Sequence, residues 1–381
     1  MATNNNNKAL NVPHLRFPEF SGEWKKVRLG EICNMLCGYA FNGEDIVEQG
    51  SYLLMRGINI TEGSIRHSSE LDRYYSGSIE KLDKYKLAVG DLVIGMDGSK
   101  VGRNSAIVSS YEDGSYLVQR VCRIKSSIGN NYILQFINNT KFHQYVDTVK
   151  TSSAIPHISL GDIQNFRISI PPTQDETDKI AKLFLLLDER IATQNKIIER
   201  LETLIKGITQ NITLHNKPNV RISECLECTS STLQESDALR SGTYPVYGAN
   251  GIVGYLDNYS TQDEAVYIIK DGSGVGTVSY VTGQCSTTGT LNTLQAKEGY
   301  SLQYLYYILK VFNFEPYKTG MAIPHIYFKD YGKAKIFCPS YTKQLQYARL
   351  LSAIDGKVST EQNSLASLSL QKQYLLRQMF I

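Results

Sequence analysis

Two short motifs carry the residues best suited to chemistry, and each motif occurs twice. DGSKVG at 97–102 is matched by DGSGVG at 271–276, and AIPHI at 154–158 is repeated at 322–326. A glycine-rich turn is the kind of segment that cradles phosphate, and histidine is the side chain most often used to move protons. The first functions to test against the sequence are therefore phosphate binding and acid–base catalysis.

The sequence lacks the neighbouring residues that phosphate binding or acid–base catalysis would require. The Gly-Lys-Ser/Thr ending of a phosphate loop is absent, and strand-like residues on both sides of 271–276 predict a hairpin turn. No nucleophile is spelled beside His157 or His325, so we predict a structural hydrogen bond for each, with a DNA phosphate contact as the alternative. The single Pro-Pro pair, Pro171-Pro172, follows Ile170, so it lacks the base-holding acceptor of an adenine methyltransferase. We therefore predict no catalytic residue in this chain.

The cysteines do not predict a metal site. Cys33/Cys37 and Cys225/Cys228 fall at helical spacing near the two matched domain starts, which leaves a shared zinc site as one interpretation. Their spacing is not that of a zinc finger, however, and no histidine accompanies them. Seven cysteines, an odd number, in 381 residues are also atypical of a secreted disulfide framework. We predict a reduced, cytoplasmic protein without a bound metal.

Composition gives weak guidance on partners. The net charge of +3 is too close to zero to identify a nucleic-acid or membrane partner. No apolar stretch approaches the ~18–20 residues of a membrane span, so we predict no membrane association. Residues 1–14 lack the apolar core of a signal peptide and are predicted to be a disordered leader.

The repeated motifs belong to a longer duplication. Five matched pairs occur in the same order along the chain, which chance would not preserve. They are 24–33 with 219–226, 97–102 with 271–276, 132–137 with 300–305, 154–158 with 322–326, and 183–191 with 350–358. The sequence therefore predicts two related halves, each made of a globular domain followed by a long helix.

The globular parts are predicted to be α+β. GDLVIGMDG and EAVYIIKDG are apolar runs that end in Asp-Gly, which is typical of a strand and its turn. NFRISIPP and KAKIFCPS alternate and then stop at proline, which predicts the last strand of each domain. The predicted boundaries are a first mixed domain over 15–171 and its helix over 172–214, then a second domain over 215–339 and its helix over 340–381.

Both long helices carry a heptad repeat that predicts a coiled coil. The predicted seam residues are Phe184, Leu187, Ile191, Ile198, Leu201, Ile205, Ile208, Leu351, Ile354, Val358, Leu365, Leu368 and Leu375. Two amphipathic helices packed separately on their own domains are the alternative. The short linker HNKPNV favours an antiparallel pair, because it can stretch only ~20 Å.

Three segments carry a resemblance to a known family. They are LRFPEFSGEWKKVRLGEIC, the long segment from SSAIPHISLGDIQNF to LETLIKGI, and the second-copy KIFCPS with LLSAIDGKV. They resemble the specificity subunit of type I restriction–modification systems over essentially the whole chain from Leu15. The second copy has PSYTKQLQYARLL, where the family usually has an acidic residue and glutamine after the proline, so the start of that helix departs from the pattern.

The resemblance implies a non-catalytic subunit. Two target recognition domains, separated by an antiparallel coiled coil with a pseudo-twofold internal repeat, would each read half of a bipartite site in double-stranded DNA. Two modification (methyltransferase) subunits would dock on it and use S-adenosylmethionine, and restriction subunits would add ATP- and Mg-dependent translocation and cleavage. No cofactor is implied for this chain itself.

Donor-bearing residues of the predicted turns and nearby loops are the candidate DNA contacts, because their side chains suit phosphates or base edges. They are Ser99, Lys100, Arg103, Arg120, Lys150, Ser152, His157, Tyr247, Asn250, Ser273, Lys318 and His325. Ordinary solvated surface and turn chemistry are the alternatives for each. A coiled-coil adaptor that binds protein or carbohydrate through its tyrosines is the rival function, and a standalone methyltransferase or nuclease is disfavoured by the missing motifs.

Overall fold

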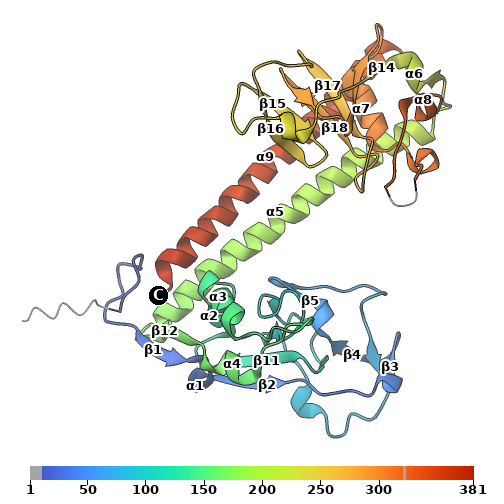
Figure 1. Ribbon diagram of the computed structural model, residues 1–381. Helices are drawn as coiled ribbons and strands as arrows, with labels where there is room; N and C mark the ends of the chain where they lie inside the picture. The colour runs from blue at the N-terminus through green and yellow to red at the C-terminus, as the bar shows by residue number, and fades with distance from the viewer. Residues whose placement is uncertain (1–10, 321–322) are drawn as a thin grey trace, which may run out of the picture. The chain divides into compact units, whose positions relative to one another are not determined.

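A computed structural model describes residues 11–320 and 323–381, and the chain divides into two compact units (Figure 1). The first unit holds residues up to Thr193 together with Leu365–Ile381, and the second holds Gln194–Ser364. Most of the predicted leader 1–14 and Ala322 of the second AIPHI motif lie outside the described residues. Across the described part of the chain, no helix has both the length and the apolarity needed to cross a bilayer.

The first unit combines short strands with short helices. Its strands are β1 (Lys25–Arg28), β2 (Cys33–Cys37), β3 (Ile46–Val47), β4 (Tyr52–Met55), β5 (Ile60–Thr61), β6 (Ser64–Ile65), β7 (Tyr74–Tyr75), β8 (Leu92–Gly95), β9 (Ser105–Ile107), β10 (Tyr116–Leu117), β11 (Val121–Ser126) and β12 (Arg167–Ile170). Its helices are α1 (Leu29–Ile32), α2 (Asn130–Ile137), α3 (Thr140–Val149) and α4 (Leu160–Asn165), with the first half of α5 (Gln174–Leu214) and the last part of α9 (Tyr341–Met379). The main sheet has the strand order β2-β11-β8-β9, and a smaller sheet has the order β10-β4-β7-β3.

The second unit is built from matching elements. Its strands are β13 (Val220–Arg221), β14 (Leu226–Ser230), β15 (Tyr244–Gly248), β16 (Gly251–Leu256), β17 (Glu264–Ile269), β18 (Val278–Thr282), β19 (Ser286–Thr287), β20 (Leu291–Ala296) and β21 (Lys335–Ile336). Its helices are α6 (Ile222–Cys225), α7 (Leu302–Lys310) and α8 (Phe328–Tyr331), together with the remaining parts of α5 and α9. The main sheet has the order β14-β20-β17-β18, and the smaller sheet has the order β16-β15-β19.

The strand orders confirm the predicted duplication and the α+β class. Sheet β14-β20-β17-β18 repeats β2-β11-β8-β9 strand for strand, and both sheets are antiparallel throughout. The predicted last strands are β12 and β21, and each pairs antiparallel with the first strand of its own unit, β1 or β13. The two smaller sheets also correspond, because each contains one parallel pair, β4 with β10 and β15 with β19.

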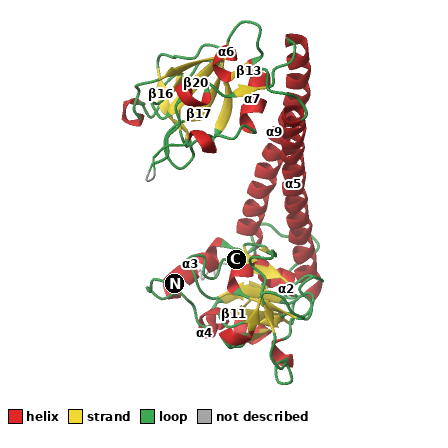
Figure 2. Ribbon diagram, turned by 90° about the vertical axis from the view of Figure 1, so that its right-hand side faces the viewer, coloured by secondary structure: helices red, strands yellow, loops and turns green. Residues whose placement is uncertain are grey.

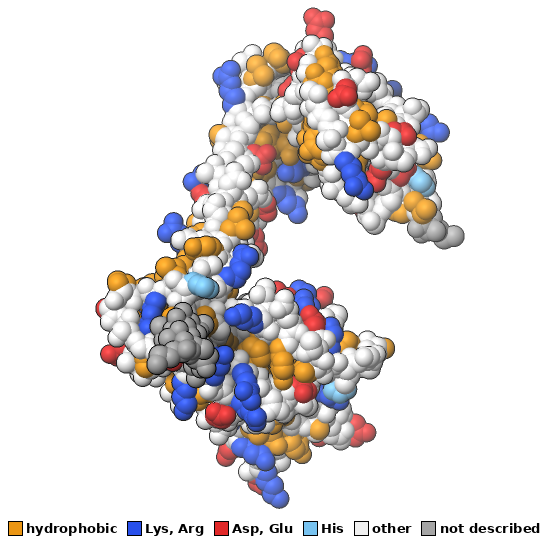
Figure 3. All heavy atoms as spheres, turned by 60° about the vertical axis from the view of Figure 1, so that its left-hand side comes forward, with side chains coloured by type: hydrophobic (Ala, Val, Ile, Leu, Met, Phe, Trp, Pro, Cys, Tyr) orange, Lys and Arg blue, Asp and Glu red, His pale blue; other side chains and the backbone are white. Residues whose placement is uncertain are grey.

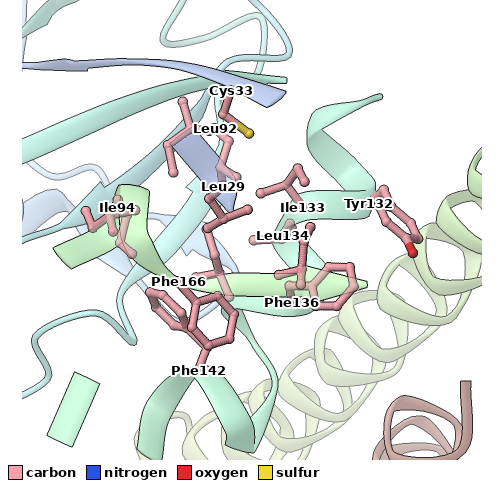
Figure 4. Packing of buried hydrophobic residues seen from close by; sticks show 14 of the residues in the cluster. Leu29, Cys33, Leu92, Ile94, Tyr132, Ile133, Leu134, Phe136, Phe142 and Phe166 are labelled. Carbon is pink, nitrogen blue, oxygen red and sulfur yellow. The ribbon is translucent and has the colours of Figure 1, made fainter. Parts of the chain in front are cut away.

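The core of the first unit lies on both faces of the main sheet. Leu92 and Ile94 of β8 join side chains of α2 in one hydrophobic cluster (Figure 4). Val93 between them joins a second cluster. Helix α2 and strand β11 of the main sheet are labelled in Figure 2. This alternation follows from the two-residue period of a strand. Each fully buried side chain of this size contributes about 1.5–3 kcal/mol relative to exposure.

Side-chain caps fix where the helices begin. The Asn139 side chain accepts a hydrogen bond from the Lys141 N–H at 3.0 Å, at the start of α3. Ser159 accepts from the Asp162 N–H at 3.1 Å in a capping box that begins α4. These contacts satisfy N–H groups that have no partner inside the helix.

The two long helices pack together and run antiparallel, as predicted. In the first unit the rings of Phe184 and Phe380 lie 5.4 Å apart, and Lys372 Nζ lies 2.5 Å from Asp188 Oδ1. Between these two contacts the residue number rises along α5 and falls along α9, which is the antiparallel order.

The residues predicted for the helix seam are all at least half-buried. Phe184, Ile198, Ile205, Leu351 and Val358 are buried, and Leu187, Ile191, Leu201, Ile208, Ile354, Leu365, Leu368 and Leu375 are half-buried.

The polar residues that interrupt the heptads have partners. Gln194 Nε2 donates to the Glu361 backbone carbonyl at 3.2 Å and also contacts its carboxylate, while Lys372 pairs with Asp188. Each interruption therefore pairs one helix with the other.

Candidate nucleic-acid interface

The two repeated motifs meet in space in each unit. In the first unit, Asp97 and His157 form a backbone bridge, and the Gly98 N–H donates to the Pro156 carbonyl at 3.0 Å. The Ile158 N–H then donates to the carbonyl of the residue before Asp97 at 3.0 Å. The AIPHI segment therefore lies antiparallel beside the turn that joins β8 to β9.

The second unit repeats this arrangement bond for bond. Asp271 bridges His325, the Gly272 N–H donates to the Pro324 carbonyl at 3.0 Å, and the Ile326 N–H donates to the Lys270 carbonyl at 2.9 Å. We name each pair of turn and Pro-His segment a turn edge: 96–103 with 154–158 in the first unit, and 270–277 with 323–326 in the second. The two repeated motifs therefore form the same backbone arrangement in both units.

Glycine is required at two positions of each turn. Gly98 and Gly102 have φ of 90° and 72°, and Gly272 and Gly276 have φ of 94° and 91°. These left-handed values favour glycine because a Cβ crowds the backbone there. At Gly102 an added Cβ would also lie 2.8 Å from Val146 Cγ2. The predicted hairpin turns are confirmed, and their left-handed backbone explains these glycines.

A third segment completes each turn edge. The Met96 N–H donates to the Arg120 carbonyl at 2.9 Å, and the Lys270 N–H donates to the Thr290 carbonyl at 3.0 Å. Arg120 is exposed and has φ of 68°, a left-handed conformation that costs a non-glycine residue roughly 1–3 kcal/mol. The strained backbone projects the predicted contact Arg120 beside the first turn edge.

The basic residues on the first turn edge, and Lys150 just before its Pro-His segment, make ion pairs near the surface. Lys100 Nζ lies 3.1 Å from Glu62 Oε1, while Arg103 and Lys150 reach the Asp147 carboxylate at 3.0 Å and 2.6 Å. Exposed pairs of this kind contribute only about 0–1 kcal/mol, so a phosphate can replace the carboxylate at little cost. Ser99 of this edge is exposed, and so is Ser152, which lies just before residues 154–158. In Figure 3, Lys and Arg side chains gather on the visible face of the first unit.

The two histidines are half-buried and make the predicted structural hydrogen bonds, but with different partners. His157 Nδ1 lies 3.0 Å from the Thr151 hydroxyl oxygen, whereas His325 Nδ1 lies 2.6 Å from Asp271 Oδ1. The histidine imidazole therefore meets a hydroxyl in the first turn edge and a carboxylate in the second.

The remaining DNA contacts predicted for the second unit lie either near the turn edge or around strand β15. Ser273 is exposed on the turn, and Lys318 pairs with Glu315 at 2.6 Å. Asn250 is exposed in the tight connection from β15 to β16, and Tyr247 is half-buried on β15.

A cavity of about 450 Å³ links Tyr247 to the second turn edge. Tyr247 and Tyr267, whose ring centroids are 5.8 Å apart, both line it, as do Ile269 and Thr277 at the two ends of the turn. Burial raises the pKa of the Tyr247 hydroxyl. Periodicity could not predict this cavity, because the residues that line it come from several strands.

The sequence also missed a buried polar cluster in the first unit. His67 Nδ1 lies 3.0 Å from Asp72 Oδ1, and its Nε2 lies 2.9 Å from Glu112 Oε1. Burial acts to raise the pKa of Glu112, but hydrogen bonds from Ser109 and His67 outweigh it and lower that pKa. A cavity of about 550 Å³ beside His67 is bordered by Tyr111. These residues lie up to 45 positions apart, so no local sequence signal could have found them.

Two interpretations of the sequence need correction. The basic stretch 114–146 lacks acidic residues after Asp113 and predicts a phosphate-facing surface, but its Arg123 instead donates to the Lys84 and Lys86 carbonyls at 3.0 Å. Cys33 and Cys37 do not share a helix, because the one-turn α1 ends at Ile32 and the chain continues as β2. Among the described residues, no three His, Cys, Asp or Glu side chains are grouped to hold a metal ion.

Comparison with known proteins places these features in a family. A family model for the type I restriction modification DNA specificity domain matches residues 21–203 and again 217–370, so each match contains one turn edge. The specificity subunit of the type I restriction enzyme EcoAI from Escherichia coli is 29% identical over 179 residues, which are 46% of this chain and 29% of the relative. The matched segment thus spans less than a third of that curated relative.

Two solved structures share the fold. The crystal structure of a type I restriction–modification S subunit from M. genitalium aligns with a TM-score of 0.69 at 16% identity, covering 97% of this chain and 99% of that chain. A structure described for complex assembly and conformational transition of the type I system aligns with a TM-score of 0.50 at 15% identity, covering 94% and 97%. At these identities the likeness concerns the fold alone.

Proposed function

This chain belongs to the family of type I restriction–modification DNA specificity domains, and on that premise we propose that it selects the DNA sequence on which a methyltransferase acts. Each unit reads one half of a bipartite site in double-stranded DNA, and the chain performs no chemistry itself. The observation that carries the proposal is the duplicated turn edge. Two copies of one surface, built on the same sheet order, suit a target that has two separate halves.

The side chains on and beside the first turn edge support DNA as the ligand. Lys100, Arg103 and Lys150 are paired to carboxylates that a phosphate backbone can displace, and Arg120 is presented by a strained backbone. Neutralising phosphates with such side chains releases counterions and makes affinity fall with salt. Ser99, Asn250 and Ser273 offer donors or acceptors suited to base edges.

The long helices are proposed to set the distance between the two half-sites. Helix α5 has 41 residues, which at about 1.5 Å of rise per residue gives ~60 Å. Its contacts with α9 in both units, including the Asp188–Lys372 and Gln194–Glu361 pairs, support a stiff spacer. The spacer then fixes how many base pairs remain unread.

The helices are also the proposed docking surface for two modification subunits. Away from the seam they leave large apolar side chains exposed, among them Leu186, Leu204, Leu350 and Leu370. Exposed apolar side chains on long helices suit protein partners. In the complex, S-adenosylmethionine would be held by the modification subunits, and ATP and Mg by restriction subunits.

Methylation mapping tests the proposal. The chain is reconstituted with its cognate modification subunits and S-adenosylmethionine, and methylated adenines are mapped on DNA of random sequence. We expect two short specified blocks at a fixed separation. A single unbroken motif, or equal methylation of all sequences, would contradict the proposal, and absence of DNA binding would favour the adaptor function.

A matched chimera sharpens the test. Residues 15–171 are replaced by the corresponding domain of another specificity subunit. One sequence block should change while the other block stays the same. A change in both blocks would mean that the two units do not read DNA independently.

A further inference from the structure

Two thiols face each other across the main sheet of the first unit. Cys37 of β2 is the direct partner of Cys122 of β11 in the antiparallel ladder. The adjacent pair is hydrogen-bonded, with the Gly38 N–H donating to the Val121 carbonyl at 2.9 Å. Because the two kinds of pair alternate, Cys37 and Cys122 occupy a non-hydrogen-bonded position, where Cα atoms are about 4.5 Å apart. A disulfide spans Cα separations of roughly 4.4–6.8 Å, so this pair meets the requirement without a large backbone movement.

The two thiols differ in reactivity. Cys37 is half-buried, and its sulfur lies 3.6 Å from Met96 Sδ, whereas Cys122 is fully buried. A hydrogen bond from Cys122 lowers the pKa of Cys37 to about 7, and the same interaction together with burial raises the pKa of Cys122. Cys37 is therefore the thiolate that meets a reagent first, and Cys122 is the thiol placed to react with it next.

The second unit lacks this pair at the matching position. Counting from the first residues of β2 and β14, the counterparts of Cys37 and Cys122 are Ser230 and Asn292, which are also direct partners. The Ser230 hydroxyl donates to Asn292 Oδ1 at 3.1 Å. A hydroxyl and an amide tie the strands there and cannot be oxidised, so any thiol chemistry at this position is confined to the first unit.

We propose that Cys37 and Cys122 form a redox modification site, at which a small-molecule disulfide converts the two thiols into an intramolecular disulfide. The Cys37 thiolate attacks one sulfur of the reagent, forms a mixed disulfide and releases the first thiolate. Cys122, as its thiolate, then attacks the Cys37 sulfur and releases the second. Two protein thiols are oxidised, one reagent disulfide is reduced to two thiols, and the two protons pass to the released thiolates.

The site lies beside the first turn edge. Arg120 is two positions from Cys122, and its carbonyl accepts the hydrogen bond from Met96, the residue that the Cys37 sulfur contacts. Oxidation moves that sulfur from Met96 to Cys122. Resting here on the proposed DNA-reading function, we infer that oxidation weakens reading of the first half-site.

Peptide mapping tests the site itself. The whole chain is incubated with oxidised glutathione between pH 6 and 8, and its peptides are analysed without reduction. We expect a Cys37–Cys122 cross-link with the loss of two hydrogens, formed faster as pH rises through the Cys37 pKa of about 7 and removed by dithiothreitol. Cys37→Ser should abolish the cross-link. A stable glutathione adduct on Cys37 without cross-linking, or no reaction at Cys37, overturns the proposal.

A second half-buried thiol provides the matched control. Cys228 lies opposite Leu294, so it has no thiol partner across its sheet, and burial raises its pKa to about 11. Cys228→Ser should leave the Cys37–Cys122 cross-link and its pH dependence unchanged. Loss of the cross-link in this variant would also overturn the assignment.

DNA binding tests the consequence separately. With modification subunits present, the oxidised chain should lose about tenfold in affinity for the specific site, the factor that corresponds to ~1.4 kcal/mol. Restoration by dithiothreitol, and no loss in Cys37→Ser, supports the inference. Cross-linking without any change in affinity overturns the effect on reading. If the reduced chain does not bind specific DNA, the proposed function fails, while peptide mapping still decides the modification site.

Discussion

The same sheet face is covered by the β5–β6 ribbon in one unit and borders a cavity in the other. In the first unit, Val93 pairs with Ala106 and Ile60 of the β5–β6 ribbon packs with them, so that all three are buried. In the second unit, Tyr267 pairs with Ser279, and both border the cavity of about 450 Å³. Among the described strands of the second unit, none corresponds to the β5–β6 ribbon.

The comparison separates the shared framework from what covers it. The framework is held by backbone hydrogen bonds, such as Gly98 to Pro156 and Gly272 to Pro324, which many side chains permit. What packs on the sheet face depends on side chains and on inserted segments such as the β5–β6 ribbon. Both can differ without changing the strand order. Two related units can therefore present different surfaces to two different half-sites.

The largest effect should come from uncovering the first face. Ile60→Ala removes a side chain that is 1% exposed and should cost the free energy of unfolding about 2–5 kcal/mol. Urea denaturation of the whole chain measures it. Ile58→Ala is the control, because Ile58 is 50% exposed and its truncation should change little. Equal losses in the two variants would mean that Ile60 does not cover the face.

The second largest effect should separate the two glycines of the first turn. Gly102→Ala combines a left-handed φ with a Cβ 2.8 Å from Val146 Cγ2 and should cost about 2–4 kcal/mol of stability. Gly98→Ala carries the φ penalty alone, about 1–2 kcal/mol, because its Cβ would meet nothing within 4 Å. Thermal unfolding compares them, and a reversed order would contradict the packing argument.

A smaller effect should be a loss of stability of the first unit at acid pH, caused by protonation of Glu112. The pKa of Glu112 is lowered in the folded state, so this carboxylate stabilises the first unit above its ordinary pKa. That contribution is lost as pH falls through the lowered folded value, beginning below about 4.3. Glu112→Gln should cost about 1–3 kcal/mol at neutral pH and flatten the acid limb of stability. A variant with an unchanged acid limb would assign the pH dependence to other groups.

The smallest effect concerns salt dependence at the first turn edge. Lys100→Ala should leave stability nearly unchanged and reduce the slope of log affinity against log salt by about 1. Glu62→Ala removes the carboxylate that competes with phosphate for Lys100, so it should raise affinity instead. DNA titrations of the reconstituted complex at several salt concentrations compare them. Changes of the same sign would exclude Lys100 from phosphate contact.

Local patterns predicted the framework better than the surfaces. The Asp-Gly endings and the proline-terminated runs correctly predicted the turns and the last strands, because both signals act through nearby backbone geometry. The bridge from Asp97 to His157 joins residues 60 positions apart, and the duplication hinted at it only through motif order. The internal roles of Arg123 and of the His67 cluster depend on tertiary packing, which periodicity does not encode.

The polar pairs inside the two long helices restrict how this protein can change its length. A slide of α9 by one turn would separate Lys372 from Asp188 and leave charge facing aliphatic seam positions, which opposes intermediate registers. We expect insertions to keep these pairs only when both helices gain the same whole heptad, about 10 Å at a time. Under the proposed function, descendants of this protein would acquire new half-site separations in jumps of about three base pairs rather than by gradual drift.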